Sequence, residues 1–264
     1  MFQKVLASFG SGGAKVDARV LDRSVRPGGT LRGEVLLTGG QVDQEIESLG
    51  VTLLARVETE GTDTVDLPVQ RVHLAGRENI RAGSQLTVPF EVRLPWETPI
   101  TSVLGKYLTG MAVGLQTNLD LANTVVDPQD VDAVSIEPLP GQHRVLDALS
   151  RLGFQFRSAT LDKNRLDGVD QQLPFFQEIT FTPSPAFAGA FSAVSVTFLA
   201  RPDDLQVVLD VVKKVRVAKG GGLGTRAQSF LGSFVVGHTD IGQNWEQRVE
   251  AWLRHVAAPR GIFD

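Results

Sequence analysis

The sequence predicts an all-β protein of two β-sandwich domains in tandem, with short helices at the N- and C-termini. Apolar and polar residues alternate with a period of two in several runs, as they do where a strand buries one of its faces. Glycine, proline, asparagine and aspartate separate these runs, which is typical of short strands joined by turns. The chain has 264 residues, which suits about two domains of roughly 130 residues each.

The first half of the chain contains several alternating runs that we interpret as strands. The run Ala14–Val20 comes first, and the turn Pro27–Gly29 separates it from the run Leu31–Leu37. Three further runs follow at Leu49–Val57, Leu86–Leu94 and Met111–Leu115. This succession of short strands predicts an N-terminal sandwich.

A domain boundary is predicted at residues 137–142. Pro138, Pro140 and Gly141 lie there, and two prolines with a glycine disfavour both a helix and a central strand. The predicted domains are therefore residues 1–137 and residues 138–264.

The second half is also expected to be mostly β. Apolar residues at helical spacing predict a short helix over residues 145–152, and alternation resumes at Phe175–Phe181 and Val194–Phe198. The segment Val51–Arg56 recurs in similar form as Val196–Arg201. This internal similarity favours a second sandwich that resembles the first.

Two terminal segments carry apolar stripes at helical spacing. The first contains Phe2, Val5, Leu6 and Phe9, and the second contains Ile241, Trp245, Val249, Trp252, Leu253 and Val256. We expect each helix to cover a face or edge of its own domain. Insertion of these helices into a membrane surface is the alternative.

Composition excludes several functional classes. The chain has no cysteine, which excludes disulfides, thiolate zinc sites and a cysteine nucleophile. Its net charge of −4 argues against nucleic-acid binding. No apolar run reaches the ~18 residues of a membrane-spanning helix, and Val5–Phe9 is too short for the core of a secretory signal. We therefore expect a cytoplasmic protein.

No motif indicates catalysis or a cofactor. The sequence lacks a Gly-x-Ser-x-Gly elbow, and the glycines of residues 10–15 precede a strand rather than a phosphate-binding helix. The histidines are scattered without metal-ligand spacing, at His73, His143, His238 and His255. We expect no catalytic residue, no cofactor and no metal ion.

Two groups of charged residues remain as candidate sites. One is acidic, and its carboxylates either hold Ca²⁺ or form turns; it comprises Asp120, Asp127, Asp130 and Asp132. The other is a basic cluster on or just after a strand; it comprises Lys213, Lys214, Arg216 and Lys219. The basic cluster is predicted either to bind a partner or to protect a strand edge from aggregation.

Several segments resemble the bacterial sporulation-control protein family, whose fold is arrestin-like. Val25–Val35 is similar to the first hairpin of arrestin-type sandwiches, in which a Pro-Gly turn leads into a strand. The more specific segments are Gly13–Asp17, Val88–Thr101, Leu115–Ala122 and Val126–Asp130. The resemblance is clear over the first 140 residues and thinner beyond them, where Gln177–Phe181 carries it.

The resemblance implies two arrestin-like sandwiches, no enzymatic activity and a regulatory role exerted through protein contacts. Such a scaffold or adaptor would act in early sporulation, cell-cycle or division control, with regulatory, cytoskeletal or division proteins as partners. A groove between the lobes or an exposed strand edge is expected to accept an extended peptide by β-augmentation. The alternative function is a peripheral module that binds anionic lipid through its terminal helices and basic cluster. Homodimer formation through a sheet edge is left open.

Overall fold

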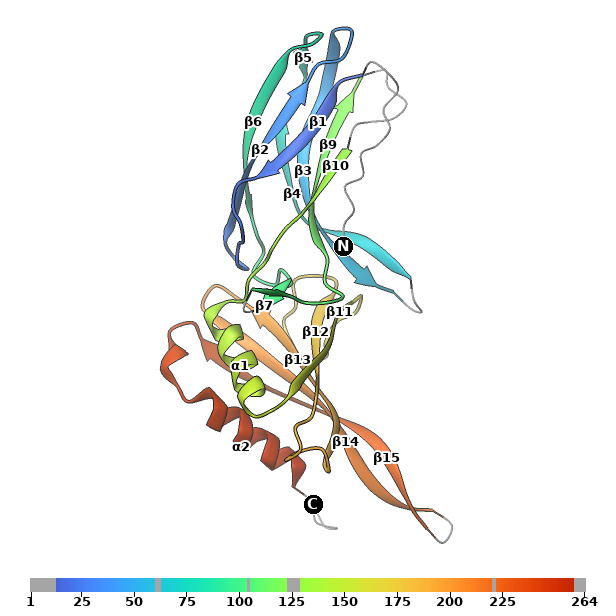
Figure 1. Ribbon diagram of the computed structural model, residues 1–264, viewed down its shortest axis with the longest axis vertical. Helices are drawn as coiled ribbons and strands as arrows, with labels where there is room; N and C mark the ends of the chain where they lie inside the picture. Colours follow the sequence, from blue (N-terminus) through green and yellow to red (C-terminus); the bar gives the residue numbers. More distant parts are fainter. Residues whose placement is uncertain (1–12, 60–62, 104, 123–128, 220–221, 259–264) are drawn as a thin grey trace. The chain divides into compact units, whose positions relative to one another are not determined.

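The computed structural model describes residues 13–59, 63–103, 105–122, 129–219 and 222–258, without the side chains of residues 214–230 and 241. Contacts divide the chain into two compact units. Unit 1 comprises Met1–Tyr107 and Met111–Glu137, and unit 2 comprises Leu108–Gly110 and Pro138–Asp264. Figure 1 shows both units coloured along the sequence.

Unit 1 is a sandwich of two antiparallel sheets (Figure 1). The first sheet has the order β1-β2-β6, with bounds Lys15–Val20, Thr30–Thr38 and Gln85–Arg93. In the second, β10 (Gln129–Ala133), β9 (Val113–Leu121) and β3 (Gln44–Glu58) lie in that order, and both β4 (Thr64–Ala75) and β5 (Glu78–Ile80) pair with β3. A separate small pair consists of β7 (Ser102–Val103) and β8 (Lys106–Tyr107).

Alternation along the strands builds the core of unit 1. Leu31, Val35 and Leu37 of β2 are at most 1% exposed, whereas Arg32 between them is exposed. Leu53 of β3 and Leu115 of β9 are register partners, and both are 0% exposed. The buried faces of the two sheets therefore form one apolar layer, as the period of two predicts.

The turn before β2 needs glycine at residue 28. Gly28 has a φ of 73°, in the left-handed region that favours glycine. A Cβ at this position would lie 2.6 Å from the ring of Trp96. The predicted Pro27–Gly29 turn thus packs its backbone directly against an aromatic side chain.

Unit 2 contains a sheet in which β11 to β15 follow one another in chain order, all antiparallel. Their bounds are Gln155–Asp162, Phe176–Thr182, Phe191–Ala200, Asp204–Lys219 and Gly222–Gly237. Three helical segments accompany the sheet: α1 (Pro140–Arg151), η1 (Asp240–Gly242) and α2 (Trp245–Ala257).

Helices α1 and α2 cover one face of this sheet. A Cβ at Gly141 of α1 would meet Leu205 and Val236, which are register partners on β14 and β15. On α2, Trp252 lies against Gly232, and Trp245 stacks on Phe234 with ring centroids 6.1 Å apart. Directly opposed residues of antiparallel strands share a face, so both helices lie on the face that presents Leu205 and Val236.

The described part of unit 2 therefore differs in detail from the second sandwich that the sequence predicted. Its described strands form one sheet, and the two helices occupy the place of a facing sheet. The helices can do so because each presents an apolar stripe. Val145 and Leu149 of α1, and Val249 and Leu253 of α2, are all 0% exposed.

The boundary region also contains a helix start that the sequence analysis did not predict. Pro140 is the first residue of α1, although prolines here were expected to block a helix. The missing N–H of proline costs nothing at the first helical position, where that group has no intrahelical acceptor. The side chain of Gln142 accepts a hydrogen bond from the N–H of Leu139 and closes the helix start.

The mostly β class is confirmed, and so is the C-terminal helix. The N-terminal helix expected from Phe2 to Phe9 lies outside the described residues. Among the helices of the described part, none has the length and apolar character needed to cross a membrane.

Candidate functional site

The basic cluster begins where β14 leaves the body of the sheet. Lys213 is the last β14 residue with a register partner on β13, namely Phe191. Beyond it, β14 pairs only with β15 among the described strands, up to the pair Lys219 and Gly222. The strand pairing thus places the cluster along a two-stranded extension, from its first residue to its last pair.

Lys213 caps helix α2. Its ammonium group donates hydrogen bonds to the carbonyl oxygens of Val256, at 2.9 Å, and Ala258, at 2.8 Å. The last carbonyls of a helix have no intrahelical donor, and the helix dipole places partial negative charge there. This lysine therefore joins β14 to the end of α2.

The other three members of the cluster have described backbones only. Lys214, Arg216 and Lys219 pair with Ala227, Thr225 and Gly222 of β15. Their side chains lie outside the described part of the structure. Partner binding by the basic cluster stays a prediction.

Two members of the acidic group hold strands of unit 1 together. Asp130 is 7% exposed, and its carboxylate accepts a hydrogen bond from the N–H of Ala18 at 3.0 Å. This bond joins β10 of one sheet to β1 of the other. Asp120 accepts a hydrogen bond from the hydroxyl of Ser48 at 2.9 Å.

The acidic group is not gathered around one point in the described structure. Asp127 lies outside the described residues, and the described part holds no group of three or more potential metal-ligating side chains. The hydrogen bond from Ala18 accounts for the burial of Asp130 without a metal ion.

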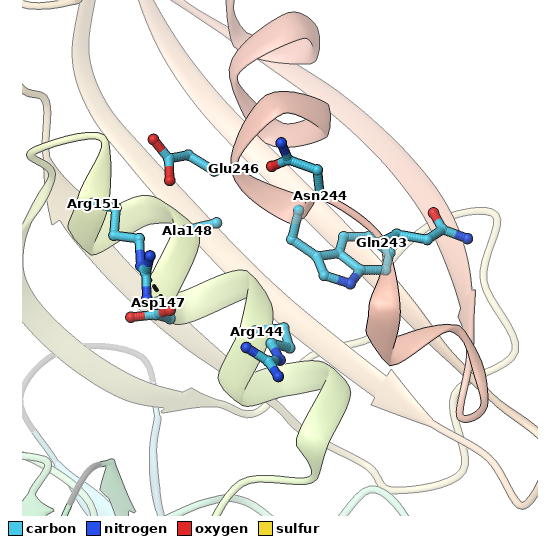
Figure 2. Close-up of a pocket in the computed structure, with 8 residues that line it drawn as sticks. Arg144, Asp147, Ala148, Arg151, Gln243, Asn244 and Glu246 are labelled. Atoms are coloured by element: carbon cyan, nitrogen blue, oxygen red, sulfur yellow. Dashed lines mark hydrogen bonds and ion pairs between the residues drawn. The ribbon is translucent and has the colours of Figure 1, made fainter.

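A groove lies between the last turns of α1 and the start of α2 (Figure 2). The groove has a volume of about 140 Å³ and opens to solvent. Its lining residues are Arg144, Asp147, Ala148, Arg151, Gln243, Asn244, Trp245 and Glu246. No local sequence pattern indicates this groove, because its two walls lie about 100 residues apart in the chain.

The charges in the groove offset one another. Arg151 donates a hydrogen bond from Nε to Asp147 at 3.0 Å, shown as a dashed line in Figure 2. Arg144 and Glu246 add one charge of each sign. The side chain of Asn244 caps α2 by accepting from the N–H of Gln247 at 3.1 Å. This arrangement contains no paired nucleophile and base.

The described groups whose pKa departs from its ordinary value belong to unit 1, whereas the groove belongs to unit 2. A hydrogen bond from Arg32 lowers the pKa of the Asp22 carboxyl below its ordinary value, and the bond length from Nη2 is 2.9 Å. The matching bond to Asp66 raises the pKa of Arg56. Both are surface ion pairs across neighbouring chain segments, and pairs of this kind are common structural features.

The histidines show no common site among the described residues. Nε2 of His238 is 2.8 Å from the carbonyl oxygen of Arg201, which ties the end of β15 to the loop between β13 and β14. Arg201 in turn donates from Nε to Asp204 at 2.7 Å. These contacts fix the β14–β15 end of the sheet.

The fold and the sites described so far define a β-rich protein of two units whose described polar groups mainly cap helices and join strands. Comparison with known proteins identifies the particular family. Residues 2–215 match the model of the SpoOM protein family, and the chain belongs to that family.

A comparison of sequences and a comparison of structures both illustrate the similarity. The chain is 30% identical over 223 residues to the sporulation-control protein spo0M of Bacillus subtilis (strain 168), and the match covers 83% of each chain. The crystal structure of Spo0M from Bacillus subtilis superposes with a TM-score of 0.77 at 23% identity. That superposition covers 93% of this chain and 99% of the other. The arrestin-like fold expected from the sequence is thereby confirmed.

Proposed function

We propose that this protein is a non-enzymatic regulatory adaptor that acts through protein–protein contacts in sporulation, cell-cycle or division control. The observation that carries the proposal is the match to the sporulation-control family over residues 2–215, together with a curated relative that bears that name. Its expected partners are regulatory, cytoskeletal or division proteins in the cytoplasm, and nucleic acid is not among them.

The geometry of the described residues supports an adaptor more than an enzyme. The groove between α1 and α2 carries balanced charges without a nucleophile and base in contact. Lys213 and Asp130, taken from the two predicted charge groups, make hydrogen bonds within their own units. Recognition of a partner would therefore use the exposed surface of the protein, as it does in protein-binding modules.

The alternative, a membrane-surface module, has less support from α2. This helix would have to expose its apolar stripe to lipid. Trp245 is 4% exposed, and Val249 and Leu253 are 0% exposed, because they pack inside unit 2. Insertion of the α2 stripe into a lipid surface would therefore require this helix to leave its own sheet.

In-cell crosslinking followed by affinity capture of the tagged protein tests the proposal. Cells are sampled in growth and in stationary phase, and partners are identified by mass spectrometry against an untagged control. We expect a small, reproducible set of regulatory, cytoskeletal or division proteins. Recovery of the tagged chain alone would contradict an adaptor role, and flotation with anionic liposomes would then test the membrane alternative directly.

A further inference from the structure

The strand β15 forms one edge of the sheet in unit 2. β15 ends the order of strands in this sheet and pairs only with β14 among the described residues. The segment from Leu231 to Gly237 is the part of this edge with described side chains. It contains no charged residue and no proline.

The hydrogen-bond pattern shows which residues point their backbone groups outward. The N–H of His238 donates to the carbonyl oxygen of Asp203 at 3.3 Å, one register step beyond the pair Asp204 and Gly237. In an antiparallel ladder, hydrogen-bonded pairs alternate with pairs that are not bonded. The backbone N–H and C=O groups of Gly232, Phe234 and Val236 therefore point toward β14. The residues that turn their N–H and C=O groups away from β14 are Leu231, Ser233, Val235 and Gly237.

These outward groups have no partner within the described part of the chain. No backbone or side-chain group of the described residues forms a hydrogen bond with them, and β14 is the one described strand that pairs with β15. The side chains of the same residues lie on the face opposite α2. Leu231 is 56% exposed and Val235 is 50% exposed, so this row offers free backbone groups and apolar side chains together.

The edge strands of unit 1 do not offer such a row. On β1 the N–H of Ala18 donates to Asp130, and just before this strand the N–H of Ala14 donates to Gln44. Pro68 lies in β4 and Pro89 lies in β6, and neither has an N–H to offer. Proline and covering side chains are the usual protection of a strand edge. The described segment of β15 has none of these features.

The surroundings of the edge indicate what would bind there. A Cβ at Gly237 would lie 3.0 Å from a carboxylate oxygen of Asp240, so a negative charge stands at that end of the edge. Asp203, next to the same strand end, is also exposed. An uncharged strand that carries a lysine or arginine at this end would match both the apolar row and the carboxylates.

We propose that the edge from Leu231 to Gly237 is a β-augmentation site for an extended segment of a partner protein. The segment alternates uncharged apolar and polar residues and has one basic residue beside Asp240. Main-chain hydrogen bonds to Leu231, Ser233 and Val235 hold it, and its apolar side chains pack on the exposed row. This inference rests on the proposed adaptor function and names the surface that performs it.

Fluorescence polarisation on the full chain tests the site with synthetic probes. The probes are labelled peptides of alternating valine and threonine with one lysine at either end, and the control peptide has alternate backbone nitrogens methylated. We expect saturable binding of one lysine-ended probe and loss of binding on methylation. Ser233→Pro removes an outward N–H and should weaken binding by about tenfold or more. Ser233→Ala keeps the N–H and should bind as the wild type does.

Two further variants make the result independent of folding. Val235→Lys changes a half-exposed side chain, leaves the backbone donor in place and should also weaken binding, because an edge lysine opposes strand addition. Asp240→Asn should weaken the lysine-ended probe while leaving a serine-ended probe unchanged. Equal binding of the methylated peptide, or unchanged binding by both Ser233→Pro and Val235→Lys, would overturn the proposal.

The same variants separate this inference from the adaptor function. If crosslinked partners persist undiminished with Ser233→Pro, the adaptor function stands and the β15 site fails. If light scattering shows a dimer that Ser233→Pro dissolves, the edge pairs with a second copy, and the proposal of a foreign segment is overturned. If the wild type captures no partner, the adaptor function itself fails.

Discussion

The ammonium nitrogen of Lys213 lies 2.9 Å from the carbonyl oxygen of Val256, although the two residues are 43 positions apart in the chain. This contact joins a central strand of unit 2 to the last turn of the helix that covers it. A lysine selected from sequence as a partner-binding residue thereby also supports the fold.

Replacing Lys213 by methionine should loosen the end of α2. The Lys213→Met side chain keeps the apolar stem and loses the donors to Val256 and Ala258, so we expect a loss of about 1 kcal/mol in the free energy of unfolding. Urea denaturation measures the loss, and hydrogen exchange should be faster in the last turn of α2. The matched control is Lys163→Met, since Lys163 is exposed. An equal loss in both variants would contradict the capping role.

Adding one methyl group at Gly232 should disturb the contact between β15 and α2. A Cβ at this position would overlap the ring of Trp252, so the indole must move. We expect Gly232→Ala to destabilise the protein by about 1–3 kcal/mol and to shift tryptophan fluorescence. Thermal unfolding checks this against Gly189→Ala, where a Cβ meets nothing within 4 Å. Equal stability of the two variants would argue against tight packing here.

Removing the carboxylate of Asp130 should weaken the junction between β1 and β10. The N–H of Ala18 would lose its acceptor in a buried setting, which costs about 1–3 kcal/mol. The measurement is the free energy of unfolding of Asp130→Ala, compared with that of Asp17→Ala at an exposed position of β1. Calorimetric titration of the wild type with Ca²⁺ should give no heat. A calcium-dependent rise in melting temperature that Asp130→Ala abolishes would instead support a metal site.

The pair Asp22 and Arg32 should make stability depend on acid pH. The folded pKa of Asp22 lies below its ordinary value of 3.8 because Arg32 donates hydrogen bonds to it. A lowered folded pKa stabilises the protein above 3.8, and this contribution disappears as the pH falls through the folded pKa. The difference in melting temperature between the wild type and Asp22→Asn should therefore shrink as the pH is lowered from about 6 to about 2. Asp167→Asn, at an exposed site, is the control; a constant difference across the range would refute the expectation.

Local pattern was enough to predict seven of the fifteen described strands, namely β1, β2, β3, β6, β9, β12 and β13. The run Leu31–Leu37 lies in β2, Leu49–Val57 lies in β3, and Leu86–Leu94 overlaps β6. Alternation succeeds here because each strand buries one face and leaves the other in water. The C-terminal stripe likewise predicted α2, since its spacing matches a helix that covers a sheet.

The pattern was less informative about the candidate surfaces. Lys213 stands out by charge, but its acceptors lie at the end of a helix that the chain reaches much later. The groove of Figure 2 needs α1 and the start of α2 side by side. No local signal marks Leu231–Gly237 as an edge, because edge and central strands share the same alternation.

The sequence by itself determined the β-rich class, the apolar stripe of α2 and the absence of cysteine chemistry. These properties depend on composition and on spacing within about ten residues, so they can be read along the chain. Only the tertiary structure decided that two helices cover the sheet of unit 2 and that Lys213 caps α2. It also decided that the outer backbone groups of Leu231–Gly237 have no partner among the described residues. Strand pairing and helix docking join residues that are far apart in the chain. The free energy of these contacts depends on which strand or helix packs beside each element, and local spacing does not determine that.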